Sequence, residues 1–165
     1  MTQQILVEMN FPTDPSTAYA MLTHHDYAVL RAEKTYGSDI TVDVSGDPAV
    51  VISKRTLPVP EELPSFAKGL VGDGIKIEET HAWGPAESDG SRQAALTVLF
   101  PTMPVKVEGS IRLSPTDQGC VVRIDAVATS SMPMVGSVVE QGVKATVVKS
   151  ARKEEQVGQE WLASH

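Results

Sequence analysis

The feature that most constrains this chain is a change of hydrophobic period near Pro133. Before it, apolar residues recur at every second position in several short segments, which is the period of half-buried β-strands. After it, valines recur at four-residue steps through Val139, Val143 and Val147, and the row continues at three- and four-residue steps to Trp161, which is the period of one face of an α-helix. This order predicts a sheet that is covered by one long C-terminal helix.

The C-terminal helix is expected to run from Ser137 to about Leu162, which is about 39 Å at a rise of 1.5 Å per residue. Ser137 and Glu140 have the spacing of a capping box, in which both side chains bind backbone N–H groups of the first turn. A helix of this length can cross the whole sheet.

About seven strands are expected before this helix. The first alternates from Ile5 to Phe11, and a hairpin follows over Asp39 to Leu57. Four more strands are separated by turns rich in Gly, Pro, Ser or Asp, so an antiparallel meander is implied. These four strands cover Ile75 to Trp83, Gln93 to Phe100, Val105 to Leu113 and Cys120 to Thr129.

Short helices are expected beside the sheet. One follows Thr13-Asp14-Pro15, an N-cap candidate with proline at the first helical position, and a second spans Asp26 to Lys34. A third short helix fits between Glu61 and Leu70. Together with the strands, these helices predict an α+β domain.

Composition limits both the fold and the function. A chain of 165 residues matches one domain, residues 1–165, with a core of its own. Hydrophobic residues make up 41% and charged residues 21%, which argues against disorder. An aromatic content of 5% and a net charge of −7 disfavour nucleic acid, because few rings are present for base stacking and an acidic surface repels phosphate.

Location, metals and cofactors follow from what the sequence lacks. No apolar run approaches the roughly 20 residues that span a bilayer, and Met1-Thr2-Gln3-Gln4 is not a signal-peptide start. We therefore expect a cytoplasmic protein without membrane insertion.

Cys120 is the only cysteine, and His24-His25-Asp26 has no second group of ligands, so no metal site is expected. No motif indicates a cofactor.

The order of the predicted elements resembles that of a known fold. A strand, two short helices, six strands and a long C-terminal helix resemble the helix-grip (START/Bet v 1-like) fold of the START-like superfamily, also called SRPBCC. A bacterial branch described as a domain of unknown function is similar in several segments. These are Met21-Leu22-Thr23, Leu57-Pro58, Leu63-Pro64, Pro104-Val105-Lys106 to Gly109, Pro133-Met134-Val135-Gly136 to Glu140, and Glu160-Trp161-Leu162.

The resemblance implies an apolar cavity between a curved sheet and the C-terminal helix. The superfamily includes lipid, steroid and polyketide binders, aromatic cyclases and chaperone co-factors, so the fold does not decide the function.

The strand from Ile75 to Trp83 holds the main polar candidates. Strict alternation places Glu79, His81 and Trp83 on the same face as Ile77. If that face is concave, the two ionisable groups are either a polar handle for a ligand or an acid/base pair. The alternative is a bulge that flips the register, or a strand end that is solvated.

Glu154 stands in the apolar row of the long helix, and its role is left open together with that of Arg55. A buried carboxylate requires a partner such as Arg55, or else its pKa is raised. The alternative is that the helix has rolled past the sheet edge, so that Arg152 to Gln156 is solvated.

A cavity wall can be assembled from the inward positions, although an apolar row is more often plain core, and only the resemblance favours a cavity. Phe66 and Leu70, with Met132 and Met134, would form the mouth, since methionine adapts to irregular ligands. The residues expected to line the ligand site are Phe66, Ile77, Glu79, His81, Trp83, Val98, Phe100, Val107, Val139, Val143 and Val147.

Three functions remain open from the sequence. The first is binding or carrying of a small apolar molecule, such as a lipid, a sterol-like or a polyketide-like compound. The second is a cyclase or dehydratase, which requires at least two of His81, Glu79 and Arg55 within hydrogen-bond reach of each other. The third is a protein-interaction module with a filled core, whose partner is unknown. The binder needs no catalytic group, and no catalytic residue is assigned.

Overall fold

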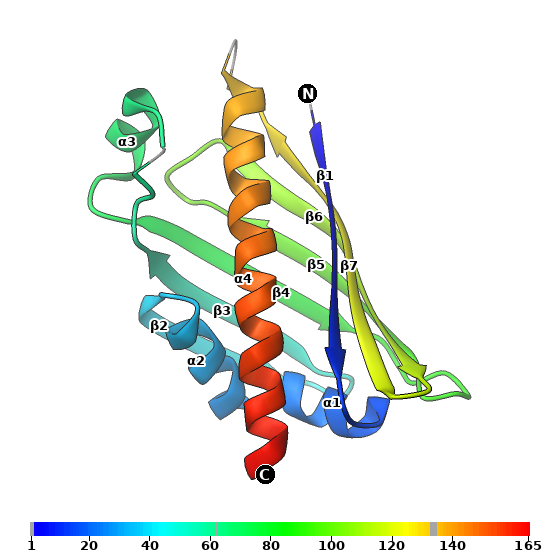
Figure 1. The fold of residues 1–165 in the computed structure, drawn as a ribbon. Helices are drawn as coiled ribbons and strands as arrows, with labels where there is room; N and C mark the ends of the chain where they lie inside the picture. Colours follow the sequence, from blue (N-terminus) through cyan, green and yellow to red (C-terminus); the bar gives the residue numbers. More distant parts are fainter. Residues whose placement is uncertain (1, 62, 133–134) are drawn as a thin grey trace.

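A seven-stranded antiparallel sheet carries the fold, in the order β1-β7-β6-β5-β4-β3-β2. We describe it from a computed structural model, which covers residues 2–61, 63–132 and 135–165 (Figure 1). β1 and β2 are the two edges of this sheet. The strands are β1 (Thr2–Phe11), β2 (Ser38–Ser45), β3 (Val50–Leu57), β4 (Ile75–Trp83), β5 (Arg92–Leu99), β6 (Val105–Thr116) and β7 (Gly119–Ser130).

Helices follow β1, β3 and β7. They are α1 (Pro15–Leu22), α2 (His25–Lys34), α3 (Ser65–Val71) and α4 (Gly136–Ser164). Asp14 caps α1 by accepting the backbone N–H of Thr17 at 2.9 Å, as its place before a proline predicts. α2 begins one residue earlier than expected, because the His24 ring accepts the backbone N–H of Asp26 at 3.1 Å.

The start of α4 differs from the predicted capping box. The helix begins at Gly136, and the residue before it makes no side-chain cap bond. Glu140 instead reaches the end of β7, where its Oε2 accepts the backbone N–H of Ser130 at 2.9 Å. Because Glu140 is fully buried, it satisfies a buried backbone donor rather than the first turn of its own helix.

α4 lies across the concave side of the sheet and does not contact all strands equally (Figure 1). It packs closely on β1, and also on β7 and α2. Gly158 permits the close approach to β1, because a methyl group there would overlap the ring of Phe11. At Gly142, by contrast, an added methyl group would meet no atom within 4 Å. The C-terminal half of α4 is therefore fitted tightly to β1.

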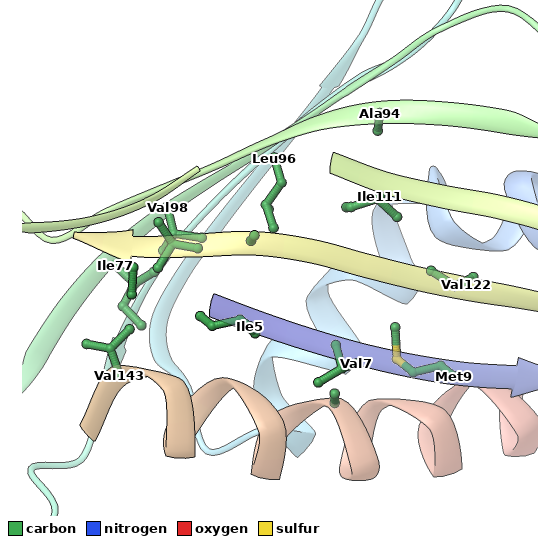
Figure 2. Close-up of a cluster of buried hydrophobic side chains, with 14 of the residues drawn as sticks. Ile5, Val7, Met9, Ile77, Ala94, Leu96, Val98, Ile111, Val122 and Val143 are labelled. Carbon is green, nitrogen blue, oxygen red and sulfur yellow. The ribbon is translucent and has the colours of Figure 1, made fainter. Parts of the chain in front are cut away.

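The core forms between α4 and the concave face. On β1, the odd-numbered residues from Ile5 to Phe11 are buried and the even-numbered ones are exposed, which is the alternation that the sequence predicts. Figure 2 shows the cluster that these side chains form with residues of β4 to β7 and with Val143 of α4. In the described part of the chain, no helix is both long and apolar enough to cross a membrane.

Candidate functional site

β4 places the predicted polar residues on the concave face. Its pairing with β3 runs without a shift from Ile75 to Ala82, so no bulge interrupts the alternation between Ile77 and His81. Glu79 is buried and His81 is partly buried on the same face as Ile77. The interpretation with a flipped register is therefore wrong, and both ionisable side chains point inward.

Glu79 is the centre of a buried charged cluster, which consists of Arg31, Arg55, Glu79, His81 and Glu154. Its Oε1 accepts hydrogen bonds from both terminal nitrogens of Arg31 at 3.1 Å. Its Oε2 accepts one from Arg55 at 3.0 Å. His81 Nε2 lies 2.6 Å from the same Oε1. One carboxylate thus holds two guanidinium groups and an imidazole on a single face of the sheet.

α4 contributes the second carboxylate. Glu154 Oε1 accepts a hydrogen bond from Arg31 Nη1 at 2.7 Å, and only 13% of the Glu154 side chain is exposed. The interpretation in which this part of α4 is solvated is therefore wrong. The partner of Glu154 is Arg31 of α2, whereas Arg55 pairs with Glu79. Arg31 joins the three layers of the site, because it connects α2, β4 and α4.

Neighbouring charges shift the pKa values of Glu79 and Arg31. Burial raises the pKa of the Glu79 carboxyl, but Arg31, Arg55 and His81 outweigh it and hold this pKa well below its ordinary value of 4.5. Burial lowers the pKa of Arg31, whereas Glu154 and Glu79 raise it, and the net direction is upward. Arg31 and Arg55 thus face the carboxylates of Glu79 and Glu154, and the formal charges of these four groups cancel.

Some polar atoms at this site remain without a hydrogen-bond partner within the described residues. They include the Tyr27 hydroxyl and the Nε of Arg55. Burial raises the pKa of the Tyr27 hydroxyl above its ordinary value, and the charge of Glu154 adds to this shift. A buried donor without a partner costs about 1 to 3 kcal/mol, so these two atoms are unfavourable features of the interior as it stands.

The apolar interior has two regions that differ in their access to water. We call the first the sealed region, in which each residue is 0% to 2% exposed. Its residues are Ile5, Met9, Phe11, Leu113, Cys120 and Val122. We call the second the open region, in which each residue is 6% to 8% exposed. Its residues are Leu57, Val71, Ile75, Ile77, Leu96, Val98, Phe100 and Val143. Most residues of the sealed region belong to β1 and β7, on which α4 packs, although Val7 of β1 is 9% exposed. The residues of the open region belong to β4, to β5 and the residue after it, and to β3, α3 and α4.

The charged cluster borders the open region directly. Across the β4–β5 pair, Glu79 stands opposite Val98 and His81 stands opposite Leu96. On the other side of β4, Arg55 stands opposite Ile77. Figure 2 shows Ile77 and Val98 on the same side of the cluster as Val143 of α4. A molecule among these apolar side chains would have its polar end next to Glu79 and His81.

Most of the predicted wall residues are buried in the interior. Trp83, Val107 and Val139 are buried, and Val147 is partly buried. Phe66 differs, because it is 43% exposed on α3, whereas Ala67 and Val71 form the buried side of that helix. Phe66 therefore lies on the outside of α3 together with Leu70.

Other predictions concern the mouth and the cavity. Met132 is partly buried against the core, and Met134 lies outside the described residues. Two open hollows lie on the outer surface rather than behind the valine stripe of α4. One, of about 600 Å³, runs beside α4 and Gln3, and the other, of about 470 Å³, lies beside Pro12 and Gln159. An interior cavity stays a prediction.

Arg31 is the functional candidate that sequence reasoning missed. A signal for it exists, since the buried residues of α2 are Tyr27, Ala28, Arg31 and Ala32, which is the spacing of one helical face. An arginine on an otherwise apolar face requires a buried anion. Glu79 and Glu154 are the two anions that it meets. Among the residues of the described ranges, no group of three metal-ligating side chains occurs.

Comparisons with known proteins agree with this fold. A family model described as "Protein of unknown function (DUF2505)" matches residues 7–162. Comparison with curated proteins gave no match. Among solved structures, TTHA0849 from Thermus thermophilus is similar, with a TM-score of 0.67 and 12% sequence identity over 98% of both chains.

Two further solved structures have names that refer to small molecules. Norcoclaurine synthase from Thalictrum flavum in complex with dopamine and hydroxybenzaldehyde gives a TM-score of 0.51 at 16% identity, over 93% of this chain and 86% of that one. The di-domain ARO/CYC StfQ from the steffimycin biosynthetic pathway gives 0.63 at 12% identity, and the match covers all of this chain and 53% of StfQ. At such identities the likeness shows the helix-grip, START/Bet v 1-like fold alone.

Proposed function

The chain belongs to the DUF2505 family, and we propose that it binds a small, largely apolar molecule between the concave face of the sheet and α4. The observation that carries this proposal is the contrast within the interior. Apolar side chains of the open region keep an exposed fraction of 6% to 8%, and they stand directly beside buried charged groups. These positions are more exposed than Ile5, Met9 and Val122 of the sealed region, and this supports a ligand site there.

The binding energy would come mainly from apolar burial, at about 25 cal/mol per Å² of surface removed from water. The charged cluster would orient the ligand rather than hold it by charge, because its arginines and carboxylates already pair with each other. A hydroxyl or carbonyl on the ligand would lie beside this cluster, in which the buried Nε of Arg55 has no hydrogen-bond partner among the described residues. It can also reach the ring of His81, whose Nε2 faces Glu79.

Native mass spectrometry of the protein purified from its own host tests this proposal most directly. We expect a co-purifying small molecule, and we expect an apolar fluorescent probe to compete with it. Val143→Trp should block the probe, because Val143 lies in the open region and a larger ring would fill the space. Val138→Trp is the matched control, since Val138 is 48% exposed on the same helix and should leave probe affinity unchanged. Equal probe affinity in a folded Val143→Trp protein would contradict the proposal.

His81 is proposed to orient the ligand. His81→Gln keeps a donor and an acceptor and should retain most of the probe or ligand affinity. His81→Leu should lose about 1 to 2 kcal/mol of binding free energy, the usual scale for a polar partner left without its hydrogen bond. Titration of both variants by isothermal calorimetry distinguishes these outcomes, and an equal loss in both would remove His81 from the site.

A second candidate function is an acid/base enzyme of the cyclase or dehydratase kind. The observation that favours it is the 2.6 Å distance between Glu79 Oε1 and His81 Nε2, with Arg55 on the other carboxylate oxygen. An imidazole held by a carboxylate can serve as a general base. Turnover of a polyketide-like substrate, with a bell-shaped pH profile that His81→Gln abolishes, would favour the enzyme over the binder.

A further inference from the structure

The outer side of α4 carries a concentration of positive charge on an otherwise acidic protein. Residues 141–153 contain Lys144, Lys149, Arg152 and Lys153 and no Asp or Glu, whereas the whole chain has a net charge of −7. None of these four cations takes part in an ion pair with another described residue. Lys149 lies 6.0 Å from the centre of the Tyr36 ring, the outer limit of a cation–π contact.

A groove of about 600 Å³ lies along this basic side of α4, and we call it the basic groove. Its cations are Lys144, Lys149 and Arg152, and Ala145 and Val148 supply apolar surface between them. Gln3 of β1 and Gln141 of α4 add neutral amide groups. The groove therefore combines positive charge, hydrogen-bonding amides and some apolar area, and it belongs to both α4 and the N-terminal part of β1.

β1 is an edge strand, and its edge is covered over only part of its length. At Asn10 the backbone N–H donates to Glu155 at 2.7 Å, and the backbone carbonyl accepts from Gln159 at 3.0 Å. Both backbone groups of a strand residue point to the same side, and successive residues alternate. Gln4, Leu6 and Glu8 therefore direct their N–H and C=O groups outward as Asn10 does.

The outward backbone groups of Gln4, Leu6 and Glu8 meet no hydrogen-bond partner among the residues that the structure describes. An exposed edge of this kind is a template for another strand. α4 covers the end of β1 near Asn10, whereas near Gln3 the strand adjoins the basic groove. The uncovered part of the edge and the basic groove are thus neighbours.

We propose that this surface binds an extended acidic segment of a partner protein, which pairs with the edge of β1 and places carboxylates against Lys144, Lys149 and Arg152. Strand addition supplies backbone hydrogen bonds, and the side chains of the groove supply selectivity for acidic residues. The proposal does not rest on the interior ligand site, since the residues that line the basic groove include none of the open region or of the charged cluster.

Charge and shape favour a protein segment over other anions. The apolar stripe of α4 is turned toward the core, so the helix has no apolar face to insert into a bilayer. A net charge of −7 repels an anionic membrane or a nucleic acid at longer range. A partner that carries its negative charge on a short strand meets only the local positive surface. The outward N–H and C=O groups of β1 match both the donors and the acceptors of a peptide backbone, whereas a lipid phosphate could use only the N–H groups.

Fluorescence anisotropy with synthetic peptides tests this proposal. The probe is a labelled peptide of about eight residues, the usual size of a paired strand, in which Glu alternates with Thr. We expect it to bind the full-length protein, and we expect added NaCl to weaken the binding. N-methylation of alternate peptide amides, which removes the pairing donors without changing the charge, should reduce affinity by about tenfold or more. Equal binding of the N-methylated peptide would overturn the strand-addition geometry.

Substitutions in the protein, rather than in the peptide, test the same surface. Lys144→Glu combined with Arg152→Glu should reduce peptide affinity by about tenfold or more, because like charges then face each other. Lys34→Glu combined with Lys76→Glu makes the same change in net charge at exposed lysines outside the groove, and it should have a much smaller effect. If both double variants lose affinity equally, the groove is not the site.

Two further outcomes would also overturn the proposal. Sedimentation of the protein with anionic vesicles, abolished by the Lys144→Glu and Arg152→Glu changes, would identify a membrane as the occupant. Self-association in analytical ultracentrifugation that the same changes abolish would identify a second copy of this chain.

Leu6→Pro tests the pairing with β1 directly, because this proline removes an outward N–H and spares the pairing with β7. A loss of peptide affinity in a folded Leu6→Pro protein would support the geometry.

Discussion

The sealed and the open region of the interior contain similar residues that differ in their exposed fraction. Val122 in the sealed region and Val98 in the open region are both valines on the concave face, but 1% of the first and 8% of the second are exposed. The difference follows from the position of α4, which packs on β1 and β7 and leaves β4 and β5 farther away. A helix that leans to one side of a curved sheet packs more closely on one region than on the other.

The comparison separates stability from binding. The sealed region contains Phe11 against Gly158 and has no room for another methyl group. The open region adjoins Glu79 and His81, where buried charges and unpaired polar atoms would be unfavourable in a plain core. Substitutions in the sealed region should therefore act on the free energy of unfolding. Substitutions in the open region should act more on binding.

Loss of Glu79 should have the largest effect. Glu79→Gln leaves the Arg31 and Arg55 guanidinium groups buried without their shared anion, and this should lower the free energy of unfolding by about 3 to 5 kcal/mol. Glu78→Gln is the matched control, since Glu78 is half-buried on the other face and lies 3.9 Å from Lys54. Such surface pairs contribute about 0 to 1 kcal/mol. Urea unfolding of both variants checks the prediction, and equal losses would contradict it.

The same carboxylate predicts a pH dependence. Its pKa in the folded protein lies well below the ordinary value of 4.5. The stability that it contributes is therefore fully present above pH 4.5 and is lost as the pH falls through the lowered pKa. Urea unfolding between neutral and acidic pH should show a steeper loss of stability for the wild type than for Glu79→Gln. Parallel curves would mean that Glu79 is not the group that titrates.

A valine pair should give the next largest effect and tests the comparison itself. Val122→Ala should lower the free energy of unfolding by about 2 kcal/mol, since each buried methylene contributes about 0.8 kcal/mol and a cavity adds to the loss. Val98→Ala removes the same atoms from a position that is 8% exposed and lies farther from α4, so its effect should be less than about 1 kcal/mol. Thermal and urea unfolding measure both, and equal values would mean that the two regions are packed alike.

A glycine pair on α4 should give the smallest effect, with opposite signs. Gly142→Ala should stabilise the protein by up to about 1 kcal/mol, because alanine favours the helix and the added methyl group meets no atom within 4 Å. Gly158→Ala should destabilise it by about 1 kcal/mol, because overlap with Phe11 outweighs the gain in helix propensity. Melting temperatures of the two variants should move in opposite directions, and a shared direction would refute the tight fit at Phe11.

Periodicity in the sequence predicts much of this fold. Alternation on β1 and β4 places Ile5, Ile77, Glu79 and His81 on the concave face, and the structure confirms each of these positions. The valine stripe predicts the buried side of α4. These features depend on local spacing, which a sequence shows directly.

Features that depend on distant contacts could not be predicted in the same way. Glu140 has the spacing of a capping box, but it binds Ser130 because β7 brings a buried N–H near it. Glu154 pairs with Arg31 because α2 packs on α4, and no spacing along the chain encodes that contact. On α3, seven residues are too few for a periodicity to distinguish the side of Phe66 from the side of Ala67.

Methyl NMR during titration with an apolar probe tests the central claim most directly, because it observes both regions in one experiment. With labelled Ile, Leu and Val methyl groups, we predict shifts at Ile77, Leu96, Val98 and Val143 and unchanged signals at Ile5, Leu113 and Val122. That result would place the ligand in the open region beside the charged cluster. Shifts confined to the sealed region, or no shift at saturating probe, would contradict the account.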